Sequence, residues 1–152
     1  MRIEFEDVCA VEDGLLAYAV IVSRYQGQWV FCKHRQRDTW EIPGGHREPE
    51  EWILNTAHRE LFEETGAADY TLSPVCVYCV AGDARSYGLL CYAEVRSFAA
   101  LPDLEIERIG FFDALPEALT YPAIQPALFE RVREWSERCG NSTKPKGGIS
   151  HA

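Results

Sequence analysis

The sequence lacks any apolar run long enough to cross a lipid bilayer. A membrane-spanning helix needs ~20 apolar residues, whereas the longest apolar candidate here, Leu15 to Val22, has the length of a β-strand. The N-terminus, MRIEFEDV, carries acidic residues where a secretory signal would have a basic region followed by an apolar one. We therefore expect no membrane partner and a cytoplasmic location.

Basic residues are also scarce in this chain. It has 15 Lys and Arg against 24 Asp and Glu, which gives a formal net charge of −9. Nucleic-acid backbones bind proteins through Lys and Arg side chains that displace counterions, so we do not expect stable nucleic-acid binding. An acidic protein can still bind a polyphosphate when metal ions lie between the two.

The six cysteines include no second C-x-x-C motif that would complete a tetrahedral zinc site. The single C-x-x-C lies in a strand-like run, where residues three apart point to opposite faces. Free cysteine inside such runs behaves as a small hydrophobic residue. We therefore expect buried, reduced thiols in place of disulfides or zinc at the four cysteines in apolar runs, Cys32, Cys76, Cys79 and Cys91.

The chain shows no internal repeat, and its 152 residues suit one domain. The last segment, Gly140 to Ala152 (GNSTKPKGGISHA), is poor in apolar residues and is typical of a disordered tail. We therefore predict one domain over residues 1–139 and a disordered tail over residues 140–152. The oligomeric state stays open.

The first half of the domain is predicted to contain a hairpin. Two runs rich in β-branched and aromatic residues, Leu15 to Ser23 and Gln28 to Cys32, flank the turn Tyr25-Gln26-Gly27. Trp40 to Ile42 is then a short extended piece, which Pro43-Gly44-Gly45 is expected to end because this tripeptide does not comfortably continue a strand or a helix.

A helix is predicted to open at Pro49 and to end at Gly66. Acidic residues cluster at its start, near the positive end of the helix dipole, and its apolar stripe is Ile53, Leu54, Ala57 and Leu61. Strand-like runs follow at 72–80, 88–95 and 109–112, and an amphipathic helix at 126–139 closes the domain. This order predicts an α+β fold with a mixed β-sheet between helices.

The chemistry of the sequence is concentrated on the middle helix. Glu60, Glu63 and Glu64 are three and four residues apart, so their carboxylates share about one quadrant of the helix. Like charges at this spacing repel one another, and a cluster of this kind is explained when cations lie between the carboxylates. Hard oxygen ligands suit Mg²⁺ or Mn²⁺. A solvated acidic face is the alternative interpretation.

Three neighbouring features favour the metal site. Arg59 precedes Glu60 and can orient neighbouring carboxylates through a forked hydrogen bond. The Gly44-Gly45 turn before the helix can bring a backbone carbonyl close to the same ions. Glu51 adds a fourth carboxylate at the start of the segment.

The segment GHREPEEWILNTAHRELFEETGA, residues Gly45 to Ala67, resembles a complete Nudix box. The box consists of Gly, five residues, Glu, seven residues, and Arg-Glu-apolar-x-Glu-Glu-x-Gly-apolar. The preceding Trp-Glu-Ile-Pro-Gly-Gly is similar to the lead-in of the same family. The chain matches every fixed position of the box: Gly45, Glu51, Arg59, Glu60, Leu61, Glu63, Glu64, Gly66 and Ala67.

The resemblance implies an α/β/α sandwich that hydrolyses a nucleoside diphosphate linked to another moiety. Glu60, Glu63 and Glu64 would hold Mg²⁺ or Mn²⁺, with the Gly45 carbonyl as an extra ligand. The remaining roles carried over by position are an orienting partner, Arg59, a supporting acidic residue, Glu51, and a general base, Glu63 or Glu64. Bound ions would neutralise phosphate charge and lower the pKa of an attacking water.

Residues outside the box supply candidates for substrate binding. Some family members use an additional acidic residue from a later loop, and Glu105 and Glu107 lie where that residue falls; the alternative for each is an ordinary loop charge. Trp40 and Tyr121 are aromatic residues that could stack on a base, and the alternative for them is a place in the core.

The box itself does not define the group attached to the phosphates. Lys33-His34, the Trp40 to Gly45 lead-in and the Leu119 to Pro126 segment are similar to the bacterial YtkD-like branch of the family. That similarity implies a small nucleotide substrate, namely a nucleoside triphosphate such as an oxidised purine nucleotide (8-oxo-dGTP). The alternatives are the 5′-triphosphate end of RNA, ADP-ribose or a dinucleoside polyphosphate, and a Nudix module that senses nucleotides without hydrolysing them.

Overall fold

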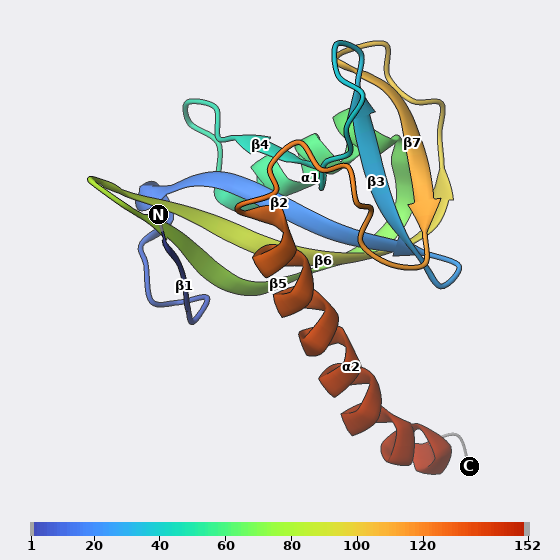
Figure 1. Cartoon of the computed structure of the whole chain (residues 1–152). Coiled ribbons are helices and arrows are strands. Elements are labelled where there is room, and N and C mark those ends of the chain that lie inside the picture. The colour runs from blue at the N-terminus through green and yellow to red at the C-terminus, as the bar shows by residue number, and fades with distance from the viewer. Residues whose placement is uncertain (1, 151–152) are drawn as a thin grey trace.

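The computed structural model describes residues 2–150, and it describes side chains up to residue 140. Within this range, a seven-stranded sheet is combined with two α-helices and one short 3₁₀ helix, η1 (Figure 1). The elements in chain order are β1 (Arg2–Glu6), η1 (Asp13–Leu15), β2 (Leu16–Tyr25), β3 (Gln28–His34), β4 (Gly44–His46), α1 (Ile53–Thr65), β5 (Ala67–Ala81), β6 (Arg85–Phe98), β7 (Ile106–Phe112) and α2 (Gln125–Ser150).

The sheet is mixed, as the sequence predicts. Its strand order is β1-β5-β6-β2-β3-β7, and β4 pairs with β2 beside this path. Strands β2 and β6 run parallel, whereas the other neighbouring strands run antiparallel. The long strand β2 therefore has β6 on one side and both β3 and β4 on the other, which brings β4 to the middle of the molecule.

The two helices cover opposite faces of the sheet (Figure 1). Because successive residues of a strand point to opposite faces, Ile21 and Val22 of β2 belong to different cores. Ile21 packs in the core that contains Leu61 of α1, and Val22 packs in the core that contains Leu128 of α2. This arrangement confirms the predicted sandwich.

The predicted hairpin is present between β2 and β3. Its turn residues Gln26 and Gly27 both have positive φ, 49° and 83°, which is the conformation of tight hairpin turns. The extended piece at Trp40 and Glu41 ends before Pro43 as expected, but Gly44 and Gly45, contrary to the expectation, begin a new strand, β4. A Cβ atom on Gly44 would lie 2.5 Å from the carbonyl oxygen of Ala19, so glycine permits this close pairing.

Helix α1 begins later than the sequence predicts, at Ile53. Glu50 has a positive φ of 64° and Trp52 is extended, so Pro49 belongs to a turn outside the helix. The expectation that acidic residues occupy the first helical turn is therefore wrong. Leu54 is 41% exposed and does not belong to the buried stripe. The predicted end is confirmed, because Gly66 caps the helix with φ 77°.

The four cysteines predicted to be buried in apolar runs, Cys32, Cys76, Cys79 and Cys91, are all buried and free. Helix α2 contains the predicted amphipathic segment, with Leu128 and Val132 buried. The predicted tail, residues 140–152, overlaps the end of α2, which runs to Ser150, and residues 151 and 152 lie outside the described residues. The disorder of this segment stays a prediction. In the described part of the chain, no helix is both long enough and apolar enough to span a membrane.

Candidate active site

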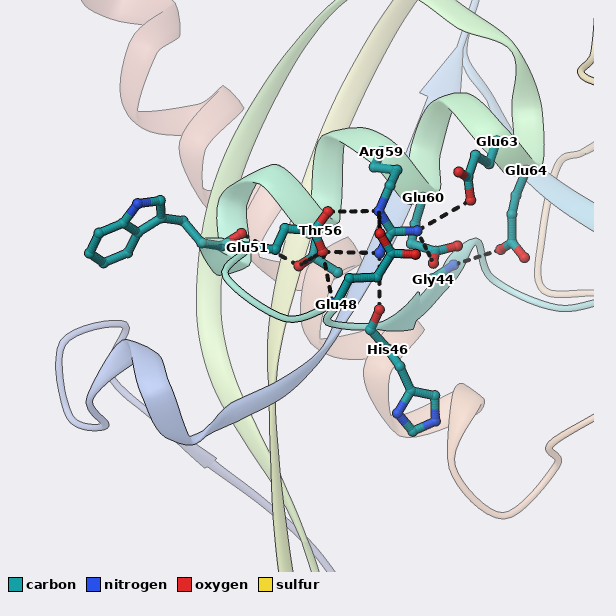
Figure 2. A network of polar contacts seen from close by, with 10 residues as sticks. Gly44, His46, Glu48, Glu51, Thr56, Arg59, Glu60, Glu63 and Glu64 are labelled. Carbon is teal, nitrogen blue, oxygen red and sulfur yellow. Dashed lines mark hydrogen bonds and ion pairs between the residues drawn. The ribbon is translucent and has the colours of Figure 1, made fainter.

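Arg59 lies at the centre of the predicted site, and its guanidinium group makes five hydrogen bonds (Figure 2). Nε and Nη2 donate to the two carboxylate oxygens of Glu51, at 2.7 and 3.0 Å. Nη1 donates to Glu60 at 2.9 Å and to Glu63 at 3.2 Å, and Nη2 also donates to the His46 carbonyl at 3.0 Å. Arg59 therefore joins α1 to the loop and the strand that precede it.

Glu51 is the structural partner of this arginine. Its carboxylate also accepts hydrogen bonds from the Thr56 hydroxyl, at 2.7 Å, and from the backbone N–H of Glu48, at 3.0 Å. The Arg59 guanidinium, helped by these two donors, lowers the pKa of Glu51 from its ordinary 4.5 to about 2. Glu51 is therefore an ionised, fully hydrogen-bonded carboxylate, and it holds the Arg59 guanidinium in place.

Glu60 faces Gly45 of strand β4. A Cβ atom on Gly45 would collide with the Glu60 carboxylate, whose Cδ would be only 2.5 Å away. The glycine therefore keeps open the space between the strand and this carboxylate. Burial raises the pKa of Glu60, and the Arg59 guanidinium opposes that effect.

Glu64 is the most deeply placed carboxylate of the cluster. Its Oε1 accepts a hydrogen bond from the backbone N–H of Gly44 at 2.9 Å, and the thiol of Cys32 lies 3.9 Å away. Burial raises the pKa of Glu64 to about 8; the Gly44 N–H opposes this effect, and the negative charges of Glu60 and other carboxylates add to it.

The three predicted metal ligands line one cavity of about 580 Å³. Among the residues that the structure describes, no three acidic, His or Cys side chains are gathered into a metal site as they stand. Instead, the Arg59 guanidinium donates hydrogen bonds to Glu60 and Glu63, and the backbone N–H of Gly44 donates one to Glu64. Carboxylate and carbonyl oxygens with the gap at Gly45 nevertheless fit a hard cation of the Mg²⁺ type.

A second cavity, of about 530 Å³, adjoins the first. Its walls include the β2 and β5 side chains of Tyr18, Val20, Tyr78 and Val80 and the residues Ile124 and Leu128 around the start of α2. The walls that the two cavities share are Gly44, Gly45, His46, Glu64 and Glu105. A molecule that extends from one cavity into the other would therefore pass the carboxylates of α1.

The structure separates the two acidic residues predicted outside the box. Glu105 lines both cavities, and its carboxylate lies 3.3 Å from His34 Nε2. Glu107 lines neither of them and forms an ion pair with the buried Lys33, at 3.3 Å. Only Glu105 is therefore placed beside the carboxylate cluster.

The two candidate stacking residues are separated in the same way. Tyr121 lines the second cavity and is 44% exposed. Trp40 is not among the residues that line either cavity, and its ring packs against Phe112 at 4.9 Å, with Arg108 over it. Its main chain bonds to Ala118 and Thr120, which holds the segment before α2 against the sheet.

Sequence reasoning missed several polar residues of the second cavity. Arg37, Glu41 and Gln125 all line it. Glu41 and Gln125 are also buried, with 9% and 6% exposure. For Glu41 a signal was present, because it is a charged residue between the apolar Trp40 and Ile42. No signal of that kind marks Arg37 or Gln125.

The chain matches the model of the NUDIX domain family over residues 15–86. It is also 32% identical over 102 residues to the Bacillus subtilis (strain 168) protein named "Putative 8-oxo-dGTP diphosphatase YtkD". That match covers 66% of this chain and 64% of the relative, so the chain spans less than two thirds of the relative's length.

Two solved structures share the fold. The Bacillus subtilis pyrophosphohydrolase BsRppH (E68A mutant) aligns with 87% of this chain and 90% of its own, with a TM-score of 0.72 and 22% identity. The NUDIX domain of Shewanella oneidensis NrtR, solved with ADP ribose, aligns with 78% of this chain and 86% of its own, with a TM-score of 0.61 and 16% identity. The complete box, the match to the NUDIX domain model and the shared fold make this chain similar to Nudix proteins in sequence and in fold.

Proposed function

We propose that this protein is a divalent-metal-dependent pyrophosphohydrolase that cleaves a phosphoanhydride bond of a nucleoside triphosphate. The observation that carries the proposal is the shared wall of the two cavities. Gly45 and Glu64 border both the cavity of the carboxylates and a cavity whose 530 Å³ is large enough for a nucleoside. The named activity of the Bacillus subtilis relative makes 8-oxo-dGTP the first oxidised nucleotide to test.

The residues of the first cavity would hold Mg²⁺ or Mn²⁺. The carboxylates of Glu60, Glu63 and Glu64 and the carbonyl of Gly45 are the oxygen donors that such ions prefer. Bound ions would supply charge neutralisation on the phosphates and a water of lowered pKa.

The protein's own residues orient this chemistry. Arg59 fixes the direction of Glu60 and Glu63, and the Gly44 N–H fixes that of Glu64. We assign the general base to Glu63 or Glu64. For Glu64, burial raises the pKa to about 8, so the metal-free group is largely protonated at neutral pH, and a bound cation would hold it ionised as a ligand or a base.

The alternative within the same fold is a sensor that binds a nucleotide without hydrolysing it. The complete set of box carboxylates, with Arg59 bonded to three of them, favours turnover over simple binding. Glu105, on the wall of both cavities, adds a further carboxylate next to that set.

A hydrolysis screen with Mg²⁺ or with EDTA tests the proposal. The substrates are nucleoside triphosphates, 8-oxo-dGTP, ADP-ribose, a dinucleoside polyphosphate and triphosphorylated RNA. We expect turnover of at least one nucleoside triphosphate that needs the metal. Tight nucleotide binding in isothermal titration calorimetry, without turnover of any substrate, would establish the sensor instead.

Two isosteric substitutions test the site. Glu60→Gln and Glu64→Gln each remove one negative charge and keep the shape of the side chain, so kcat is expected to fall by orders of magnitude with little change in the melting temperature. Glu117→Gln is the matched control, because Glu117 is exposed and lines neither cavity. Turnover close to wild type in both site variants would refute the assignment of metal ligands.

A further inference from the structure

The loop before β7 is fastened to the residue that follows β3. Arg35 Nε donates a hydrogen bond to the Leu104 carbonyl at 2.8 Å, and Arg35 Nη2 donates to the Asp103 carboxylate. The backbone N–H of Arg35 donates to the Glu105 carbonyl at 3.0 Å. One arginine therefore binds three consecutive residues of the loop, and this fixes the backbone that carries the Glu105 side chain.

The carboxylate of Glu105 has a partner of its own, the imidazole of His34 at the end of β3. His34 Nδ1 accepts a hydrogen bond from the backbone N–H of Gln36 at 3.1 Å. Because a backbone N–H can only donate, Nδ1 carries no proton, and the proton of the neutral ring lies on Nε2. Nε2 lies 3.3 Å from Glu105 Oε2 and donates to it. The Gln36 N–H therefore sets the tautomer in which His34 holds Glu105.

An irregularity in the pairing of β3 with β7 lies beside this contact. Two neighbouring residues of β3 have partners on β7 that are two positions apart, Arg108 and Ile106, so Glu107 is an extra residue in the ladder. A β-bulge of this kind redirects the side chains around it. Glu107 forms its ion pair with Lys33 outside both cavities, whereas Glu105 lines both. The bulge thus separates the two glutamates.

The charge of Glu105 reaches the carboxylates of α1. Burial is the largest cause of the raised pKa of Glu60 and of Glu64, and the negative charge of Glu105 adds to it in both cases. The Glu105 side chain is 79% exposed, so packing does not select one of its rotamers. Hydrogen bonds must therefore keep it beside the cluster.

We propose that His34 and Arg35 are positioning residues, which hold the Glu105 carboxylate at the wall that the two cavities share. The inference rests on the proposed function. Arg35 fixes the backbone of the loop, and His34 fixes the side chain that stands on it. An ionised carboxylate only accepts hydrogen bonds, so Glu105 at this wall is suited to orient a water beside the phosphates or to take its proton.

A double-mutant cycle tests whether His34 acts through Glu105. His34→Phe keeps a flat ring without a donor, so kcat in the hydrolysis screen should fall about 5-fold or more while KM stays within about 2-fold. His34→Gln can still donate from its amide nitrogen and should restore most of kcat. When Glu105 is already replaced by Gln, His34→Phe should change kcat by less than about 2-fold.

The same cycle distinguishes direct contact with substrate, because His34 itself lines the second cavity. A higher KM alone, or an equal loss of kcat with Glu105 and with Gln at position 105, would overturn the inference. His58→Phe is the matched control, because His58 is exposed and lines neither cavity. This variant should leave kcat unchanged.

Arg35→Met tests the loop contact in the same way. It removes both side-chain hydrogen bonds to the loop, so kcat should fall by about 3-fold or more, and this loss should also disappear when Glu105 is replaced by Gln. Arg96→Met is the matched control. Its ion pair with Asp69 involves a similarly exposed arginine, 49% against 48% for Arg35, and Arg96 lines neither cavity. Equal kcat values in the two variants would overturn the role of Arg35.

NMR of the His34 imidazole in EDTA tests the placement without hydrolysis. At about pH 8, where the ring is neutral, the nitrogen shifts should show the proton on Nε2, and Glu105→Ala should speed its exchange with water. Glu107→Ala is the matched control and should not. A proton on Nδ1, or equal exchange in both variants, would overturn the inference.

The two kinds of measurement separate this inference from the proposed function. The expected NMR result without turnover of any nucleotide supports the placement of Glu105 and refutes only the proposed function. Metal-dependent turnover that is insensitive to His34→Phe and Arg35→Met refutes only the positioning role.

Discussion

Replacing Arg59 with methionine removes the guanidinium group that connects the loop, the strand and helix α1. Methionine retains apolar contacts of the side-chain stem but donates no hydrogen bond. Glu51 would keep only the Thr56 hydroxyl and the Glu48 N–H as donors. Glu60 would lose the positive charge that opposes its burial. We therefore expect a folded but less stable protein.

The size of the loss follows from the pKa of Glu51. A fall from 4.5 to about 2 corresponds to about 3 kcal/mol of stability at neutral pH, at ~1.4 kcal/mol for each tenfold change in proton affinity. Arg59 is the largest cause of that fall, but two other donors contribute, and the Glu51 side chain is 14% exposed to screening solvent. We therefore expect Arg59→Met to lower the free energy of unfolding by about 2 kcal/mol.

The assay is urea denaturation followed by circular dichroism, in EDTA so that metal binding does not contribute. A carboxylate of lowered pKa stabilises the fold above its ordinary pKa, and this contribution is lost as the pH falls towards the lowered value. The difference between wild type and Arg59→Met should therefore shrink between about pH 5 and about pH 2. A loss below about 0.5 kcal/mol at neutral pH, or one that stays constant down to about pH 3, would refute the role of the Arg59–Glu51 pair.

Three further predictions concern the carboxylate cavity. Because burial raises the pKa of Glu64 to about 8, its protonated form stabilises the metal-free protein, and this stabilisation declines as the pH rises from about 4.5 through 8. The increase in melting temperature on adding Mg²⁺ should accordingly be larger at about pH 9 than at about pH 6. An increase in melting temperature that is independent of pH would contradict this prediction. Gly45→Ala would push a methyl group into the Glu60 carboxylate, so kcat should fall about 10-fold or more, while circular dichroism shows a folded protein. Glu105→Gln should lower kcat, whereas Glu107→Gln, which breaks an ion pair outside both cavities, should affect only the melting temperature; equal effects on kcat would contradict the separation of these two residues.

The sequence sufficed for the parts of the fold that local patterns determine. The two runs rich in β-branched and aromatic residues around the turn at Gln26 and Gly27 predict the β2–β3 hairpin, and Gly66 predicts the end of α1 because its left-handed conformation suits glycine. The spacing of Glu60, Glu63 and Glu64 similarly places them on one face of a helix, and all three do line one cavity.

Other features depend on contacts between distant segments and could not be predicted. Pro49 suggests a helix start, but Glu50 has a positive φ, and the next residue, Glu51, accepts a hydrogen bond from Arg59. Gly44 suggests a break, yet it pairs with Val20, a strand residue that lies 24 positions earlier in the numbering. In both cases the tertiary interaction outweighs the local preference.

The carboxylates of α1 and the polar residues of the second cavity differ in how the sequence specifies their positions. The carboxylates of α1 lie within one turn or two of the same helix, so one continuous motif determines their geometry. Glu41 and Gln125 are 84 positions apart in the numbering and both line the second cavity, where the backbone N–H of Ile42 donates to Gln125. A substitution at position 125 can therefore alter the second cavity while the carboxylates of the box stay in place. For this reason we expect substrate preference to follow the lead-in and the start of α2, while the reaction follows the box.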